Sequence, residues 1–223
     1  MPVSEGPRTS YREHLEALRN TVLRMGTFAE EMLIRAITAL VNQDVALARE
    51  VHRSDDVADD LDFEIDRRCT SLLASQQPMA GDLRDILGAL KIATDLERIA
   101  DYAKDIAKVA IAVGEEPWFK PLADIQRMGE VAVEQLRRAL RAFADHDLDL
   151  ARDVARGDEQ LDDLWHGLWA ELPARMQTEP AVVPQAMRLV LVARYLERIG
   201  DHTVNVMERL QYMDTGRRQA LTD

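Results

Sequence analysis

The chain has 223 residues, of which 47% are hydrophobic and 30% are charged, and its formal net charge is −12. This length and composition can bury one large core or two smaller ones. The excess negative charge argues against a general nucleic-acid binder and against electrostatic docking on anionic lipid, because both need a basic surface. It favours partners with basic faces, or bound cations.

Cys69 is the only cysteine, so a disulfide framework within one chain is impossible and a cysteine-based zinc site is disfavoured. The N-terminal stretch MPVSEGPRTSYREH has no apolar region of the kind found in signal peptides. The apolar run LVLVA is far shorter than the ~20 residues that cross a membrane. We therefore expect a cytoplasmic protein that reaches a membrane only through its partners.

Apolar residues recur three and four positions apart along most of the chain, which is the pattern of amphipathic helices, and strand patterns are absent. Prolines and glycines interrupt the pattern only near its turns, and Pro173 is expected to end or kink one helix early. The pattern predicts an all-α protein with six long helices, at residues 9–43, 45–75, 80–113, 120–145, 147–177 and 181–214.

The chain contains an internal repeat. Residues 24–61 align with residues 127–164 with half of the positions identical, and Leu96–Ile99 match Leu196–Ile199. The recurrence of Met-Gly at 25–26 and 128–129 suggests close helix contact at these glycines. We expect two tandem three-helix bundles, or one elongated six-helix array, with pseudo-twofold symmetry. The first repeat spans residues 1–115 and the second spans 116–215, and residues 216–223 form a frayed tail.

Carboxylates lie one helical turn apart at four places, although like charges at this spacing repel one another. The pairs are Asp55 with Asp59, Glu97 with Asp101, Asp158 with Asp162, and Glu197 with Asp201. In an antiparallel hairpin, Asp55 would face Asp101 and Asp59 would face Glu97, because both pairs share a midpoint at Pro78 in the predicted turn. The second set has its midpoint between Glu179 and Pro180. Each repeat thus brings four carboxylates to one height.

Unpaired carboxylates at one height would repel strongly, so a multivalent cation is the natural counter-charge. Ligation by carboxylates alone favours iron, manganese or magnesium over zinc. Lys104, Arg98 and Arg198 offset part of the charge, but the counterpart of Lys104 in the second repeat is Val204.

Two neighbouring positions bear on the predicted cation sites. His202, adjacent to Asp201, is the one histidine that we keep as a possible ligand. Asp105 would extend the first cluster by a turn, whereas its counterpart is Asn205. The second cluster is therefore expected to hold its metal less well.

Two other interpretations remain open. The acidic faces could be solvated surfaces of a metal-free helical scaffold. A di-metal carboxylate bundle of the ferritin type would need Glu-x-x-His pairs, but Ala100 and Gly200 stand three residues after Glu97 and Glu197. The sequence has neither a Gly-rich phosphate loop nor a nucleophile with its base, so we do not expect an enzyme.

The segments QQPMAGDLRDILGALKIATDLERIADYAKDIAK (76–108) and LVARYLERIGDHTVNV (191–206) closely resemble the PhoU family of bacterial phosphate-uptake regulators. With two tandem copies, the resemblance covers nearly the whole chain. It implies two three-helix bundles and acidic motifs that can bind metal. The residues that match these motifs are Asp55, Asp59, Glu97, Asp101, Asp105, Asp158, Asp162, Glu197 and Asp201.

The resemblance also implies a function. Proteins of this family are negative regulators of the phosphate-starvation response. They act as adaptors, often as homodimers, that link the ATP-binding subunit of a phosphate ABC transporter to a sensor histidine kinase.

Overall fold

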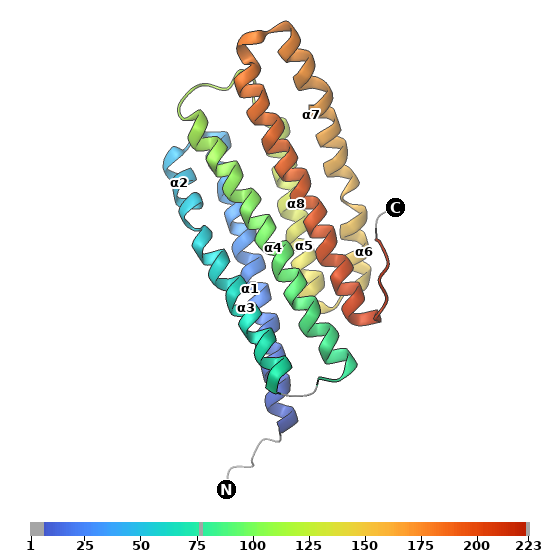
Figure 1. Ribbon diagram of the computed structural model, residues 1–223. Helices are drawn as coiled ribbons and strands as arrows, with labels where there is room; N and C mark the ends of the chain where they lie inside the picture. The colour runs from blue at the N-terminus through green and yellow to red at the C-terminus, as the bar shows by residue number, and fades with distance from the viewer. Residues whose placement is uncertain (1–6, 76–77, 222–223) are drawn as a thin grey trace.

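The computed structural model describes residues 7–75 and 78–221, and within these ranges it is helical with no strand (Figure 1). Residues 1–6, 222–223 and 76–77, which open the QQP motif, lie outside the described residues. The elements are α1 (Pro7–Asn42), α2 (Val45–Arg53), α3 (Asp55–Ser75), α4 (Ala80–Val113), α5 (Ala123–Asp145), α6 (Leu148–Arg156), α7 (Glu159–Thr178), the 3-10 turn η1 (Pro180–Val182) and α8 (Val183–Thr215).

Two of the six predicted helices are each divided by a short turn. The predicted helix 45–75 is split at Ser54 into α2 and α3, and the predicted helix 147–177 is split at residues 157–158 into α6 and α7. At the first break the Ser54 hydroxyl donates to the Val51 carbonyl at 2.8 Å, which satisfies a carbonyl at the end of α2. Asp55 of the first predicted cluster directly follows the first break, and Asp158 of the second lies within the second break, just before α7.

Pro173 was expected to end or kink its helix, and the structure shows that it does not end it. Helix α7 continues through Pro173 to Thr178. A proline inside a helix removes one backbone hydrogen bond and costs stability. The neighbouring Leu168 and Leu172 are fully packed in the core, with 3% and 0% of their surfaces exposed, and this burial holds the helix in place.

The same turn leads into the second helix of each repeat. Gln43 and His146 both adopt left-handed backbone conformations, with φ of 54° and 53°. The following Asp44 and Asp147 cap the next helix by accepting hydrogen bonds from the backbone N–H groups of Leu47 and Leu150, each at 2.9 Å. The sequence repeat is therefore also a repeat of local structure.

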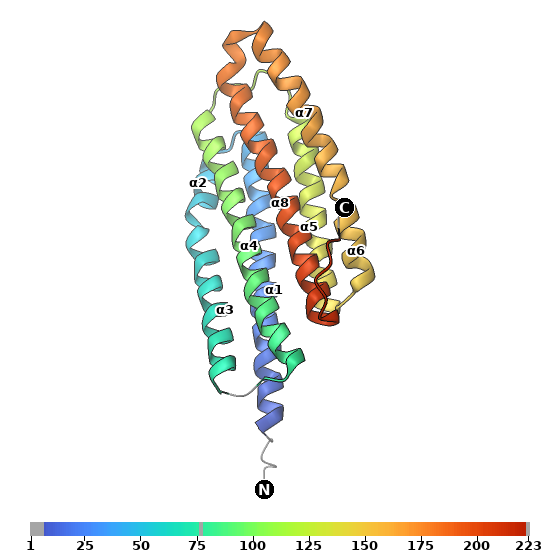
Figure 2. The ribbon, with the colours of Figure 1, turned by 45° about the vertical axis from the view of Figure 1, so that its right-hand side comes forward.

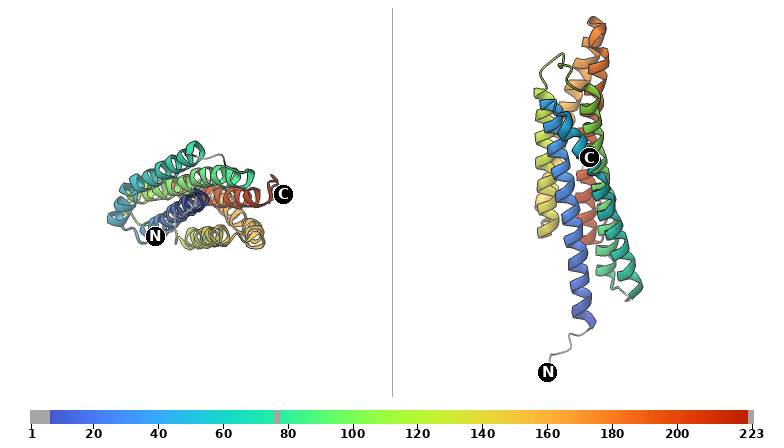
Figure 3. Two further views of the ribbon diagram at one scale, coloured as in Figure 1. Left: turned by 90° about the horizontal axis from the view of Figure 1, so that it is seen from below. Right: turned by 90° about the vertical axis from the view of Figure 1, so that its left-hand side faces the viewer.

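Each repeat forms a bundle, and the two bundles share one core. Helix α1 packs against α3 and α4, and α5 packs against α7 and α8. The bundles join where α4 lies antiparallel beside α8 and α1 lies beside α5 (Figure 2). Viewed from one end, the helices form a single elongated cross-section (Figure 3). The repeat predicted either two three-helix bundles or one elongated array. The structure combines both, because the two bundles lie side by side in one elongated array.

Two glycines allow α1 and α5 to approach each other, as the Met-Gly recurrence suggests. A Cβ atom at Gly26 would collide with the side chain of Leu140, and one at Gly129 would lie 2.5 Å from Ile37 Cδ1. Gly26 and Gly129 are equivalent in the repeat, as are Ile37 and Leu140. The contact is therefore duplicated about the pseudo-twofold axis.

The C-terminal segment does not project freely in its described part. The Leu221 backbone N–H donates to Glu208 Oε1 at 3.3 Å, and Leu221 packs against the core. Residues 216–221 thus lie along the end of α8, whereas residues 222–223 of the predicted frayed tail lie outside the described residues.

None of the helices in the described ranges combines the length and the hydrophobicity of a membrane-spanning segment.

Filling the glycine notch should destabilise the protein. Gly26→Leu is expected to lower the free energy of unfolding by about 1–3 kcal/mol, the usual cost of overpacking a filled core. Chemical denaturation measures this change. Leu140→Ala in the same chain should recover part of the loss, because it makes room for the new side chain.

Gly167→Leu is the matched control, because Gly167 is an exposed helical glycine with no atom within 4 Å of its added Cβ. Equal effects of Gly26→Leu and Gly167→Leu would show that close packing at the α1–α5 contact is not what Gly26 provides.

Candidate functional site

The first acidic cluster lies between α3 and α4, and a lysine bridges it. Lys104 Nζ donates to Asp55 Oδ2 at 2.5 Å and to Asp101 Oδ1 at 2.7 Å. The two carboxylates therefore lie opposite each other, as the hairpin register predicts. The Lys104 side chain is only 17% exposed, so the two helices share a partly buried counter-charge.

Lys104 and Asp101 both stay ionised in this bridge. Burial opposes the charged ammonium, but the hydrogen bonds to Asp101 and Asp55 outweigh it and raise the pKa of Lys104. Burial also opposes the charge of Asp101, yet the hydrogen bond from Lys104 lowers the pKa of that carboxyl. The centre of the first cluster is therefore neutralised by the chain itself.

Glu97 is not bound by Lys104, and its surroundings disfavour the ionised form of its carboxyl group. Burial, and then the charge of Asp101, raise its pKa to about 7. Among the described residues, Glu97 is paired with Arg98, whose Nε lies 3.4 Å from Glu97 Oε2.

Asp62 also belongs to this cluster, although the sequence analysis did not predict it. Burial and the charges of Asp66 and Asp59 raise the pKa of Asp62, which in turn contributes to the raised pKa of Glu97. The spacing of Asp55, Asp59, Asp62 and Asp66 places all four on one face of α3, and this spacing was the signal that could have found it.

The second cluster, between α7 and α8, contains a deeply buried carboxylate. Asp158 is 7% exposed and accepts a hydrogen bond from Gln135 Nε2 at 3.0 Å. Burial is the main cause that raises the pKa of Asp158 to about 6, and the charges of Asp162 and Asp201 raise it further. The hydrogen bond from Gln135 acts in the opposite direction and lowers this pKa. Burial and the charge of Asp201 also raise the pKa values of Asp162 and Glu197. The four predicted residues thus lie within electrostatic reach of one another.

The cations of the second cluster stand at its edge. Arg198 Nη1 lies 2.8 Å from Asp201 Oδ2, and Arg194 pairs with Glu197. The position of Lys104 is filled by Val204, which is 6% exposed and carries no charge. No lysine therefore bridges the two helices here as Lys104 does in the first repeat.

Two oxygen atoms of the second cluster lack partners. Gln135 Oε1 and Glu197 Oε2 are both buried and accept no hydrogen bond. Buried acceptors without partners are costly, and most are satisfied by a donor, water or an ion. The carboxylates of Asp158, Asp162 and Asp201 belong to the same cluster, and oxygen atoms are the ligands that hard cations prefer.

Gly200 and Gln135 explain why Asp158 is buried. A Cβ at Gly200 would collide with Asp158 Oδ1 and lie 2.7 Å from Leu161 Cδ2. In the first repeat the equivalent residues are Ala100 and Met32, which leave neither the space nor the amide donor for a buried Asp55. Gln135 was missed from the sequence, because a lone glutamine on α5 carries no metal-ligand pattern.

Asp105 contacts residues outside the first cluster, and its predicted role as a metal ligand stays a prediction. Its carboxylate pairs with Lys108 at 2.8 Å. It also lies close enough to Tyr195 of α8 to raise the pKa of that phenol, together with burial, which is the larger cause. Its counterpart Asn205 donates to Asp95 Oδ1 at 3.3 Å. Both positions face the contact between α4 and α8, and the weaker metal binding expected of the second cluster stays a prediction.

His202 also points to that contact. Its Nδ1 lies 2.9 Å from Asp95 Oδ1, and its ring is 5.9 Å from that of Tyr102. The structure therefore gives this histidine a partner on α4.

Among the described residues, no group of three or more His, Cys, Asp or Glu side chains is arranged to hold a metal ion as it stands. The ion pairs with Lys104, Arg194 and Arg198 orient several of the carboxylates instead. Metal ligation by the predicted residues stays a prediction. The donor set of the second cluster fits a cation better than that of the first, because Lys104 is absent there.

Stability of the metal-free protein should fall as the pH rises from about 4 to about 7. Glu97 and Asp158 have folded-state pKa values of about 7 and about 6, above their ordinary values of 4.5 and 3.8. The folded state therefore binds more protons than the unfolded state in this range, and deprotonation destabilises it. We expect a loss on the order of 1 kcal/mol per group, measured by chemical denaturation in a chelator.

Glu97→Gln combined with Asp158→Asn should flatten this pH dependence. Asp60→Asn combined with Asp163→Asn is the matched control, because both residues are exposed carboxylates of the same two bundles, on α3 and α7. An unchanged slope in the first double variant would assign the pH dependence to other groups.

Comparisons with known proteins match the chain over both repeats. A sequence model described as the PhoU domain matches residues 22–110 and again residues 125–210. The phosphate-specific transport system accessory protein PhoU homolog of Rhizobium meliloti is 36% identical over 93% of this chain and 88% of its own length. The homolog of the same name from Clostridium acetobutylicum is 36% identical over 97% of this chain and 99% of its own.

Solved structures agree with the sequence matches. The crystal structure of PhoU from Pseudomonas aeruginosa superposes with a TM-score of 0.90 at 34% identity, over 93% of this chain and 100% of that one. The phosphate transport system regulatory protein PhoU from Streptococcus pneumoniae superposes with a TM-score of 0.88 at 27% identity, over 94% and 99%. From its two matched domains and its fold, the chain belongs to the PhoU family.

Proposed function

We propose that this chain is a regulatory accessory protein of a phosphate transport system and a negative regulator of the phosphate-starvation response. The observation that carries the proposal is the match to the PhoU domain in both repeats, residues 22–110 and 125–210. The relatives named above are called accessory proteins of phosphate-specific transport. In this role the chain acts by binding and not by turnover.

The proposed partners are the ATP-binding subunit of the phosphate transporter and a sensor histidine kinase. When phosphate is ample, the chain keeps the kinase from activating its response regulator. It works in the cytoplasm, as a homodimer, and reaches the membrane through these partners. The net charge of −12 supports partners with basic faces.

We further propose that the second cluster is the stronger cation site, with iron, manganese or magnesium as the ion. The unpartnered oxygens of Gln135 and Glu197 and the replacement of lysine by Val204 support this order. A bound cation would supply the positive charge that Lys104 supplies in the first cluster. This order is the reverse of the one expected from Asn205.

Loss of the chain should release the starvation response. In a host that lacks it, a phosphate-starvation promoter is expected to be active in phosphate-replete medium, because nothing restrains the kinase. A transcriptional reporter measures this, and pull-downs from phosphate-replete and phosphate-starved cells identify the bound subunits. A promoter that stays repressed without the chain would rule out the regulatory role.

Exchanging the residues at position 104 and its counterpart should exchange the metal affinities of the clusters. Val204→Lys is expected to weaken Mn²⁺ binding to the second cluster about tenfold or more, because an ammonium then competes with the ion. Lys104→Val should strengthen binding to the first. Isothermal titration with Mn²⁺ and element analysis of the purified protein measure both changes.

The exposed pair Ala170→Lys and Lys91→Val serves as the matched control. Wild-type protein without metal, or metal that is unaffected by Asp101→Ala together with Asp201→Ala, would support the metal-free scaffold. Oxygen consumption by the iron-loaded protein would instead support a di-metal bundle.

A further inference from the structure

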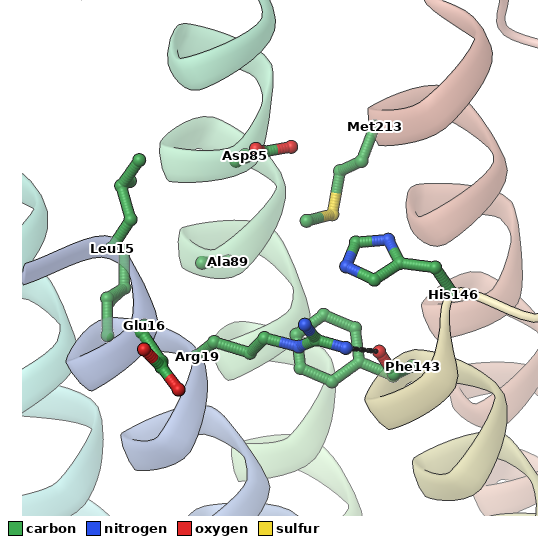
Figure 4. Close-up of a pocket in the computed structure, with 9 residues that line it drawn as sticks. Leu15, Glu16, Arg19, Asp85, Ala89, Phe143, His146 and Met213 are labelled. Atoms are coloured by element: carbon green, nitrogen blue, oxygen red, sulfur yellow. Dashed lines mark hydrogen bonds between the residues drawn. The ribbon is translucent and has the colours of Figure 1, made fainter. Parts of the chain in front are cut away.

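A cavity of about 300 Å³ lies at the end of the molecule where α1, α4, α5 and α8 meet (Figure 4). Its floor is apolar and consists of side chains from all four helices. Four polar residues stand around it. The lining side chains that matter here are Ala89, Phe143 and Met213 in the floor, and Arg19, Asp85 and His146 around it.

The pseudo-twofold axis relates this place to the opposite end of the molecule, where the linker between the two repeats lies. There Trp118 and Phe119 pack against the core. In the repeat alignment Leu40 is equivalent to Phe143, and Gln43 to His146. Likewise, Gln185 and Leu189 stand where the cavity has Asp85 and Ala89. The cavity is thus the open counterpart of a site that the chain fills with its own aromatic residues.

Two glutamines hold the backbone of the linker at the filled end. Gln43 Nε2 donates to the Glu116 carbonyl at 2.6 Å. Gln185 Nε2 donates to the Pro117 carbonyl at 2.9 Å, and its Oε1 accepts from the Phe119 N–H at 2.8 Å. The segment is therefore held as a non-helical peptide by hydrogen bonds to its backbone, while its aromatic rings meet the core.

The indole of Trp118 has its own acceptor at the filled end. Its Nε1 donates to the Leu40 carbonyl at 3.4 Å. At the open end the equivalent carbonyl is that of Phe143, and Arg19 Nη2 donates to it at 3.0 Å. Figure 4 shows this arginine reaching across the cavity from α1. An acceptor for an aromatic N–H is thus present at the same place, with a solvent-accessible arginine as its current partner.

The open end also keeps the groups that can hold a backbone. His146 has the same left-handed conformation as Gln43. Its Nδ1 lies 3.0 Å from Asp214 Oδ1, so Nε2 is the ring nitrogen left to contact a bound backbone. Asp85 can accept an N–H as Gln185 does, and it is half-buried at the edge of the cavity. Ala89 is smaller than Leu189, which leaves space between α4 and α8.

We propose that this cavity binds an aromatic side chain, tryptophan or phenylalanine, on a non-helical peptide segment of a partner protein. The segment is held as the chain holds its own linker at the other end. The inference goes beyond the proposed regulatory role and does not depend on the metal sites. A binding assay with purified components tests it separately from the reporter that tests that role.

The probe is a labelled peptide with the sequence of residues 114–122, GEEPWFKPL, titrated with the full-length protein and followed by fluorescence anisotropy. We expect saturable binding. The same peptide with alanine in place of both aromatic residues should bind about tenfold or more weakly, because the contacts with the floor are lost.

Variants of the protein locate the bound peptide. Ala89→Trp fills the cavity and should weaken binding about tenfold or more, whereas Ala170→Trp on the exposed face of α7 should leave it unchanged. Asp85→Ala with His146→Ala should weaken binding about fivefold or more, since two backbone contacts are lost. His146→Gln, which installs the residue of the filled end, should preserve it.

Absence of saturable binding to the wild-type protein overturns the proposal, and so does equal binding of the alanine peptide. Binding that Ala89→Trp leaves unchanged also overturns it, because the peptide then lies elsewhere. If peptide binding that Ala89→Trp leaves unchanged is accompanied by a change in oligomeric state, the peptide has replaced the linker at the filled end, and copies of the chain exchange their linkers. Circular dichroism checks that each variant folds, and if Ala89→Trp does not, the Asp85→Ala, His146→Ala variant decides.

Discussion

The antiparallel contact between α4 and α8 is the constraint on which the rest of the structure depends. It joins the two bundles into one core and lies across the pseudo-twofold axis. Tyr102 stacks on Tyr195 at 5.7 Å between ring centres, and Asp95 accepts from His202 and Asn205 beside them. Because this pairing fixes the rotation of both helices, it also directs Glu97 and Glu197 away from the axis, each toward the outer helix of its own bundle.

The two repeats share one arrangement of helices but differ in the charges that lie between them. In the first, Lys104 lies between the helices and neutralises the facing carboxylates. In the second, Val204 removes that charge, and Gln135 and Gly200 draw Asp158 into the protein, where burial raises its pKa to about 6. A carboxylate that is buried beside other carboxylates is costly unless it is protonated or neutralised. The second cluster therefore keeps a buried carboxylate without a bridging lysine, whereas Lys104 neutralises the centre of the first cluster, where the pKa of Glu97 is nevertheless raised as well.

Sequence alone was sufficient for the repeat, the helices and the register of the hairpins, because each depends on periodicity or on a midpoint along the chain. It was insufficient for features set by the rotation of a helix against a distant one. Asp105 shares a helix face pattern with Glu97 and Asp101 but lies toward α8. The burial of Asp158 depends on Gln135 from another helix, and no local pattern reveals that contact. The breaks at Ser54 and Gly157 were hidden within continuous helical periodicity.

These divergences follow one rule: at each duplicated place, one copy is satisfied by the chain itself and the other is left open. Lys104 satisfies the first acidic cluster, and the linker with Trp118 satisfies the cavity at one end. Their counterparts are the second cluster, where Val204 replaces the lysine, and the cavity beside His146, where Arg19 takes the carbonyl that the indole takes at the other end. The occupants proposed for them, a cation and an aromatic segment, are the counterparts of those in the satisfied copies. Since duplication gives both copies a similar geometry, loss of an internal occupant from one copy is a route by which a structural contact can become a binding site.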